Sequence, residues 1–195
     1  MRKFTTKECE DFLRRVDAEL ESECRIVLIG GGAVALKYKG THATTDLDLW
    51  SIRATSTKPQ VAKTDSDFWA AVERAQAGMT PPIPVERATI AEPPYNFEDR
   101  LLSLDLGLTK LTVDIPEAHD LVLMKLARAE AHDLDAIEDI NKAVPLNVET
   151  LIERYLETKT QVNGSLENHR LNFLAAIARV FGEVTAADVD ERTKL

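Results

Sequence analysis

Two aspartates, Asp46 and Asp48, are separated by a single leucine in the stretch TTDLDLW. Side chains alternate between the two faces of a strand, so carboxylates at this spacing point the same way. Carboxylate oxygens are ligands that Mg²⁺ prefers, and Mg²⁺ is typically held by one or two carboxylates together with substrate phosphates. The pattern therefore predicts a site for Mg²⁺, or for Mn²⁺, at Asp46 and Asp48.

A glycine triplet, Gly30 to Gly32, follows an apolar run and precedes a short helical pattern. Glycines lack a Cβ atom, so backbone N–H groups and the N-terminus of a following helix can approach a phosphate closely. Two acids alone, or glycines alone, are common. Their combination in this order is more specific and predicts a site for a metal-bound nucleoside triphosphate, with Gly31 and Gly32 binding the nucleotide.

The order of these motifs resembles the first motif of the nucleotidyltransferase superfamily that includes DNA polymerase β. The sequence is more closely similar to minimal bacterial nucleotidyltransferases, including the AbiEii-type toxins. The resemblance implies that Thr45 also binds the nucleotide. Relatives often carry an arginine shortly before the threonine, where this chain has His42. The residues that carry the resemblance are Gly31-Gly32-Ala33-Val34-Ala35, Gly40 and Thr44-Thr45-Asp46-Leu47-Asp48.

The same resemblance implies a second cluster, formed by Asp120, Lys125 and Asp133. A lysine there neutralises triphosphate charge in the transition state, and Asp133 orients Lys125 or an acceptor hydroxyl. The catalytic residues expected are thus Asp46, Asp48, Lys125 and Asp133. His132 stands where relatives often have arginine. The alternative is a solvated helix face with routine ion pairs, each contributing about 0.3–0.5 kcal/mol.

The superfamily fold usually supplies a third carboxylate from a neighbouring strand. Asp105 and Asp114 both lie between apolar residues, and Glu98 and Asp99 are further candidates. The sequence leaves all four open.

The function implied is metal-dependent transfer of a nucleotide unit from an NTP to RNA such as tRNA, to a protein or to a small molecule. The resemblance also allows a role in toxin–antitoxin or phage-defence systems, with a cognate antitoxin as partner. One alternative is a non-catalytic nucleotide-binding or partner protein. Another is a dinucleotide-binding oxidoreductase, since Gly30, Gly32 and Ala35 fit a loose G-x-G-x-x-A fingerprint. The aspartates come too early for its ribose-binding acid.

The elements that must position these residues indicate an α+β fold, with a small mixed sheet and a helical C-terminal half. Residues 1–116 are expected to form the nucleotidyltransferase-like core with an N-terminal helix, and 117–195 a helical region packed on it. The polar tail after Gly182 is expected to fray. Strands are predicted at 25–30, 45–52, 84–90, 100–106 and 109–115, and helices at 5–22, 32–39, 63–76, 117–143, 147–162 and 165–181.

Composition sets further bounds on this chain of 195 residues with a formal net charge of −9. The negative charge argues mildly against an extended nucleic-acid surface, although a bound metal supplies positive charge for a nucleotide. No apolar run reaches the roughly 20 residues of a membrane helix, so no membrane partner is expected. Cys9 and Cys24 are expected to be reduced thiols in the cytoplasm.

Overall fold

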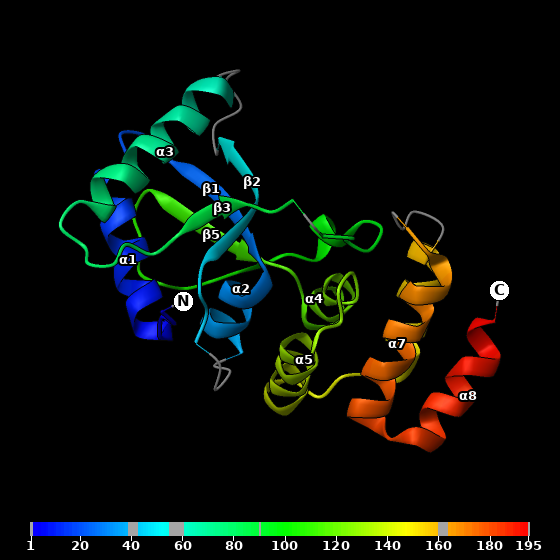
Figure 1. Cartoon of the computed structure of the whole chain (residues 1–195). Coiled ribbons are helices and arrows are strands. Elements are labelled where there is room, and N and C mark those ends of the chain that lie inside the picture. Colours follow the sequence, from blue (N-terminus) through cyan, green and yellow to red (C-terminus); the bar gives the residue numbers. More distant parts are fainter. Residues whose placement is uncertain (1, 39–42, 55–60, 90, 160–163, 195) are drawn as a thin grey trace. The chain divides into compact units, whose positions relative to one another are not determined.

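The computed structural model describes residues 2–38, 43–54, 61–89, 91–159 and 164–194. The chain divides into two compact units, which we describe separately. The first unit comprises Met1–Ala88 and Leu101–Pro116, and the second comprises Thr89–Arg100 and Glu117–Leu195. The first holds a mixed sheet and the second is helical, which confirms the expected α+β class (Figure 1).

A five-stranded sheet in the order β3-β2-β1-β5-β4 forms the centre of the first unit. β1 pairs antiparallel with β2 and parallel with β5. An antiparallel β1–β2 pair is not the parallel crossover of a dinucleotide-binding unit, so the structure does not support that alternative. All five expected strands are present, although β3 and β4 are shorter than predicted. The strands are β1 (Cys24–Ile29), β2 (Leu47–Ala54), β3 (Val85–Arg87), β4 (Leu102–Ser103) and β5 (Leu111–Ile115).

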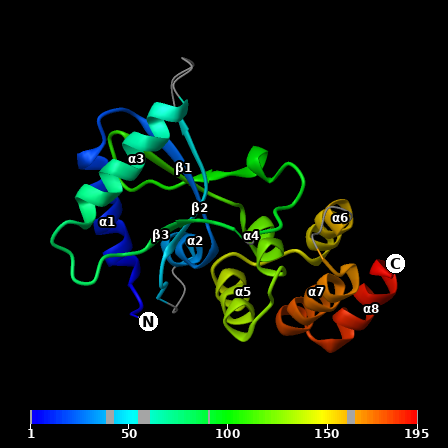
Figure 2. The ribbon, with the colours of Figure 1, turned by 45° about the horizontal axis from the view of Figure 1, so that its top comes forward.

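Three helices belong to the first unit, namely α1 (Thr6–Glu19), α2 (Gly30–Lys37) and α3 (Val61–Gln76). α1 starts with a capping box in which Thr5 and Glu8 satisfy each other's backbone N–H groups. α1 and α3 pack against each other and lie on the same side of the sheet (Figures 1 and 2).

One face of β2 is apolar, because Leu47, Leu49 and Ile52 are buried there. The other face carries polar side chains, among them Asp48. A β-bulge at Trp50 of β2 shifts the register of the pairing between β2 and β1. The extra residue changes the alternation of side chains within β2, so that Leu47 and Leu49 before the bulge and Ile52 after it all lie on the buried, apolar face.

The second unit contains a short 3-10 helix η1 (Phe97–Arg100) and five α-helices around a shared core. We expected one continuous helix over 117–143, and this prediction is wrong. The chain breaks near Ala129, which adopts a left-handed φ of 49°. The helices are α4 (Ala118–Lys125), α5 (Ala131–Ala143), α6 (Val148–Thr158), α7 (Leu166–Phe181) and α8 (Glu183–Thr193).

The expectation that the tail after Gly182 frays is also wrong. It forms α8, in which Val189 and Thr193 are fully buried. Arg192 pairs with Glu149 of α6 at 2.5 Å and fixes the end of the helix. No helix among the described residues is long and apolar enough to cross a membrane.

Candidate functional site

The glycine triplet lies directly against the segment that carries the two aspartates. An ideal Cβ built on Gly30 would lie 2.3 Å from Oδ2 of Asp48. On Gly31 it would lie 2.8 Å from Oγ1 of Thr44, and on Gly32 2.7 Å from a methyl group of Leu47. A side chain at any of the three positions would therefore force either the contacting side chain or α2 to move.

Helix α2 begins at Gly30 without a side-chain cap, since Ile29 at the N-cap makes no such hydrogen bond. The first N–H groups of a helix have no intrahelical partner, and the helix dipole makes this end favourable for anions. The close approach of Asp48 to Gly30 therefore places a carboxylate and a potential anion-binding helix end side by side.

Asp46 and Asp48 differ slightly from their predicted setting. β2 begins at Leu47, so Asp48 lies in the strand while Asp46 precedes it by one residue. The Thr45 hydroxyl donates to Oδ2 of Asp46 at 3.1 Å, and the Thr44 hydroxyl donates to the Asp46 carbonyl at 2.8 Å. Both aspartates are half-buried. The threonines thus hold the turn that presents Asp46.

The donor set fits a hard divalent cation that also binds substrate phosphates. Across the described residues, no group of three or more His, Cys, Asp and Glu side chains is arranged to hold a metal. Two carboxylates are nevertheless the usual protein contribution to a Mg²⁺ site whose remaining ligands are phosphate and water. The missing Cβ of Gly30 leaves room for the Asp48 carboxylate itself beside the start of α2.

The strand register distinguishes among the four candidates for a third carboxylate. Asp48 pairs with Ile29, and Asp114 of β5 pairs with Val27, two residues earlier on β1. Paired residues point to the same face of a sheet, so Asp48 and Asp114 share the polar face. Asp105 is an exposed residue outside any strand, and Glu98 and Asp99 are exposed residues of η1 in the second unit.

Asp114 is buried, with 2% of its side chain exposed. Its Oδ1 accepts a hydrogen bond from Ser103 at 2.6 Å, and its Oδ2 lies 3.2 Å from Nε of Arg25. Oδ2 has no hydrogen-bond partner among the described residues. One carboxylate oxygen is therefore held firmly and the other only by an ion pair.

In the second unit, the break between α4 and α5 brings Lys125 and Asp133 together. Nζ of Lys125 lies 3.0 Å from Oδ1 of Asp133, and the two side chains are 6% and 1% exposed. Arg128 and His132 approach the same oxygen at 3.4 and 3.7 Å. Burial alone would raise the pKa of Asp133, but the charge and hydrogen bond of Lys125, together with the charges of Arg128 and His132, outweigh burial and lower the pKa.

Asp120, the third member of the expected second cluster, has different partners. It is fully buried and accepts two hydrogen bonds from Arg100, at 2.8 and 3.0 Å, and one from Arg154 at 2.9 Å. Arg154 also contacts Glu117 at 2.5 Å. This network joins η1, α4 and α6, which gives Asp120 a structural role.

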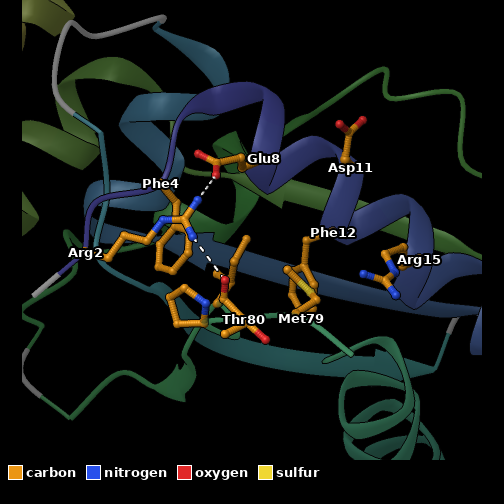
Figure 3. Close-up of a pocket in the computed structure, with 10 residues that line it drawn as sticks. Arg2, Phe4, Glu8, Asp11, Phe12, Arg15, Met79 and Thr80 are labelled. Atoms are coloured by element: carbon orange, nitrogen blue, oxygen red, sulfur yellow. Dashed lines mark hydrogen bonds and ion pairs between the residues drawn. The ribbon is translucent and has the colours of Figure 1, made fainter. Parts of the chain in front are cut away.

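A cavity of about 230 Å³ lies between α1 and the segment 79–83 (Figure 3). Arg2 lies over the ring of Phe4 and contacts Glu8 at 2.5 Å and the Thr80 carbonyl at 3.4 Å. None of the predicted site residues lines this cavity.

Gly40 and His42 of the expected motif lie outside the described residues. Sequence reasoning overlooked the contact of Gly30 with Asp48 and the partners of Asp114. The alternation of Thr112 and Asp114 with apolar neighbours in LTVDI could have indicated that Asp114 shares a face with other polar residues.

The profile of one protein family, described as nucleotidyltransferase of unknown function (DUF6036), matches residues 8–184. The match spans both units. No curated protein and no solved structure matches the chain.

Proposed function

Since this chain belongs to the DUF6036 family of nucleotidyltransferases, we propose that it transfers a nucleotide unit from an NTP to an acceptor, with Mg²⁺ or Mn²⁺ held by Asp46 and Asp48. The observation that carries the proposal is the contact between Gly30 and Asp48. It places a carboxylate that can ligate a metal beside a helix N-terminus whose N-cap residue makes no side-chain hydrogen bond, and both features suit a metal-bound triphosphate.

In this mechanism the backbone N–H groups of Gly31 and Gly32 face the triphosphate, and Thr45 supports Asp46 through its hydroxyl. A bound metal supplies charge stabilisation and activates the attacking hydroxyl. Among the four candidates, Asp114 is the best supported as the third carboxylate, because it shares the polar face of the sheet with Asp48. In that role it accepts the proton of the acceptor hydroxyl.

Lys125 and Asp133 are proposed to act as one group. The ion pair with the Asp133 carboxylate fixes Lys125 in one position. The resemblance to the toxin-like nucleotidyltransferases is what assigns Lys125 to the triphosphate, with Asp133 as its positioning residue. Lys125→Met is then expected to weaken NTP binding as well as transfer.

The direct test is incubation of the chain with each radiolabelled NTP, Mg²⁺ and a cell extract. Label should enter one class of macromolecule or small molecule from one preferred NTP, and chelation of the metal should stop it. Asp48→Asn and Asp114→Asn should abolish labelling, while Asp105→Asn, an exposed acid in the same unit, should leave it unchanged. Labelling that survives Asp48→Asn would refute the mechanism.

The acceptor and the biological role are separate proposals. RNA such as tRNA, a protein and a small molecule are the candidate acceptors, and the labelled product identifies which is used. A toxin role with a cognate antitoxin rests on the resemblance to AbiEii-type proteins. Inducible expression tests it, since wild-type protein should arrest growth and Asp48→Asn should not.

A further inference from the structure

The segment that presents Asp46 is bonded to residues near the N-terminus of the chain. Phe4 and Thr44 form an isolated antiparallel β-bridge. The N–H group of Phe4 donates to the Thr44 carbonyl at 2.7 Å, and the N–H group of Thr44 donates to the Phe4 carbonyl at 3.1 Å. The two residues thus exchange both backbone hydrogen bonds, as in a hydrogen-bonded pair of an antiparallel ladder. A shift of Thr44 would therefore break its contacts with Phe4.

Thr44 connects this bridge to the candidate metal site. Thr44 is buried, and its hydroxyl donates to the Asp46 carbonyl at 2.8 Å. A Cβ added to Gly31 would lie 2.8 Å from the same hydroxyl oxygen, so Thr44 also lies against the start of α2. On the other side of Asp46, the N–H group of Leu47 donates to the Pro84 carbonyl at 2.9 Å. The backbone around Asp46 is therefore held from both sides.

The ring of Phe4 anchors the bridge in the first unit. Phe4 is 3% exposed and lines the cavity of Figure 3 together with Phe12 of α1 and Ile83. The guanidinium group of Arg2 lies over the ring, 5.3 Å from its centroid. An isolated pairing of two strands is at best marginally stable in water, and this bridge is a single residue pair. Burial of the Phe4 ring must therefore hold the bridge to Thr44 in place.

We propose that Phe4 is a positioning residue of the metal site and acts through Thr44 on Asp46. This inference rests on the proposed function and extends the site to a residue that contributes no ligand. Groups that orient metal ligands typically change metal affinity or activity by about 10- to 100-fold when they are lost. With the Phe4 ring truncated, the bridge opens, the Asp46 carboxylate samples more positions, and the metal binds more weakly.

The test measures how much Mg²⁺ the full chain needs in order to bind a fluorescent NTP. Fluorescence anisotropy gives the Mg²⁺ concentration for half-maximal binding to wild type, Phe4→Ala and Phe12→Ala, at a temperature at which circular dichroism shows each protein to be folded. Phe12→Ala is the matched control, because Phe12 lines the same cavity and is 1% exposed but lies within α1 and outside the bridge.

We expect Phe4→Ala to raise the required Mg²⁺ concentration at least about tenfold. Phe12→Ala should leave it unchanged, although both variants lose stability through the truncated ring. Thr44→Val removes the hydroxyl that donates to Asp46 and should also raise the requirement. Because Phe4 acts through Thr44, the double variant should need far less Mg²⁺ than the product of the two single effects. If Phe4→Ala does not fold, Phe4→Leu is compared with Phe12→Leu, and only Phe4→Leu should need more Mg²⁺.

Equal Mg²⁺ requirements of the Phe4 variants and their Phe12 counterparts would overturn the inference and leave the proposed function standing. Effects of Phe4→Ala and Thr44→Val that multiply in the double variant would overturn it as well, since Phe4 would then act independently of Thr44. Wild-type protein that binds no NTP at any Mg²⁺ concentration would refute the proposed function, and the inference with it.

Discussion

Replacement of Gly30 by alanine tests whether the close approach of α2 to Asp48 builds the nucleotide site. Gly30 has a φ of +66°, and an added Cβ would lie 2.3 Å from Oδ2 of Asp48. Ordinary contacts of a Cβ begin at 3.4 Å, so the carboxylate or the helix must move by about 1 Å (3.4 minus 2.3). A misplacement of this size can reduce a rate about 100-fold.

The left-handed backbone adds a cost that has to be separated from this displacement. Alanine in that conformation costs about 1 kcal/mol. Gly107 provides the control, because its φ is +65° and nothing lies within 4 Å of an added Cβ. Gly107→Ala should therefore lose about 1 kcal/mol of unfolding free energy and keep its activity.

The assay pairs urea unfolding with Mg-NTP binding and transfer. Gly30→Ala should lose at least as much stability as Gly107→Ala and, in addition, about 100-fold in transfer rate. If Gly30→Ala binds Mg-NTP and transfers the nucleotide as well as Gly107→Ala does, the contact with Asp48 has no part in the site.

Three further predictions concern buried charges and thiols. Asp17 accepts hydrogen bonds from the three backbone N–H groups of residues 109–111; Asp17→Ala should therefore cost about 3 kcal/mol of unfolding free energy in urea. Burial alone would raise the pKa of Asp17, but these donors hold it below its ordinary value. The stabilisation by Asp17 is therefore complete above about pH 4 and is lost as the pH falls through its lowered pKa. The unfolding free energies of the wild type and of Asp17→Asn, compared during an acid titration, should show this loss. Lys125→Met removes the nearest partner of the Asp133 carboxylate, of which 1% is exposed, and leaves it the longer contacts with Arg128 and His132, so it should cost about 3 kcal/mol of unfolding free energy. Adding Asp133→Leu should restore most of this stability, but it should not restore transfer. Burial raises the pKa of the Cys24 thiol to about 12, so a thiol reagent should label it only after denaturation.

The sequence predicted the elements that depend on local patterns. The apolar run of β1, the glycines and the alternating residues of β2 all lie within one short stretch, so hydrophobic periodicity was enough to place them. The residues of β1 and β2 that share a face with Asp114 could not be predicted, because they depend on the pairing of β5 with β1 across most of the first unit.

The break between α4 and α5 could not be predicted from local propensity. Residues 126–130 are good helix formers, yet the chain turns there. Nδ2 of Asn172, in α7, donates to the Leu126 carbonyl at 2.8 Å, and Lys125 pairs with Asp133 across the break. Both contacts satisfy groups at the broken helix end, and both depend on tertiary structure. α8 is a different case, because Ala186, Val189 and Thr193 share one helix face, and their spacing was a usable signal.

The proposed function depends on Asp46 and Asp48 holding the metal of an NTP. Equilibrium binding of a fluorescent NTP, with and without Mg²⁺, tests it most directly. Wild-type protein should bind the nucleotide only with Mg²⁺, and Asp46→Asn and Asp48→Asn should each lose at least about tenfold in affinity, while Asp11→Asn on the surface of α1 should not. Binding and transfer that remain unchanged in both site variants would contradict the account.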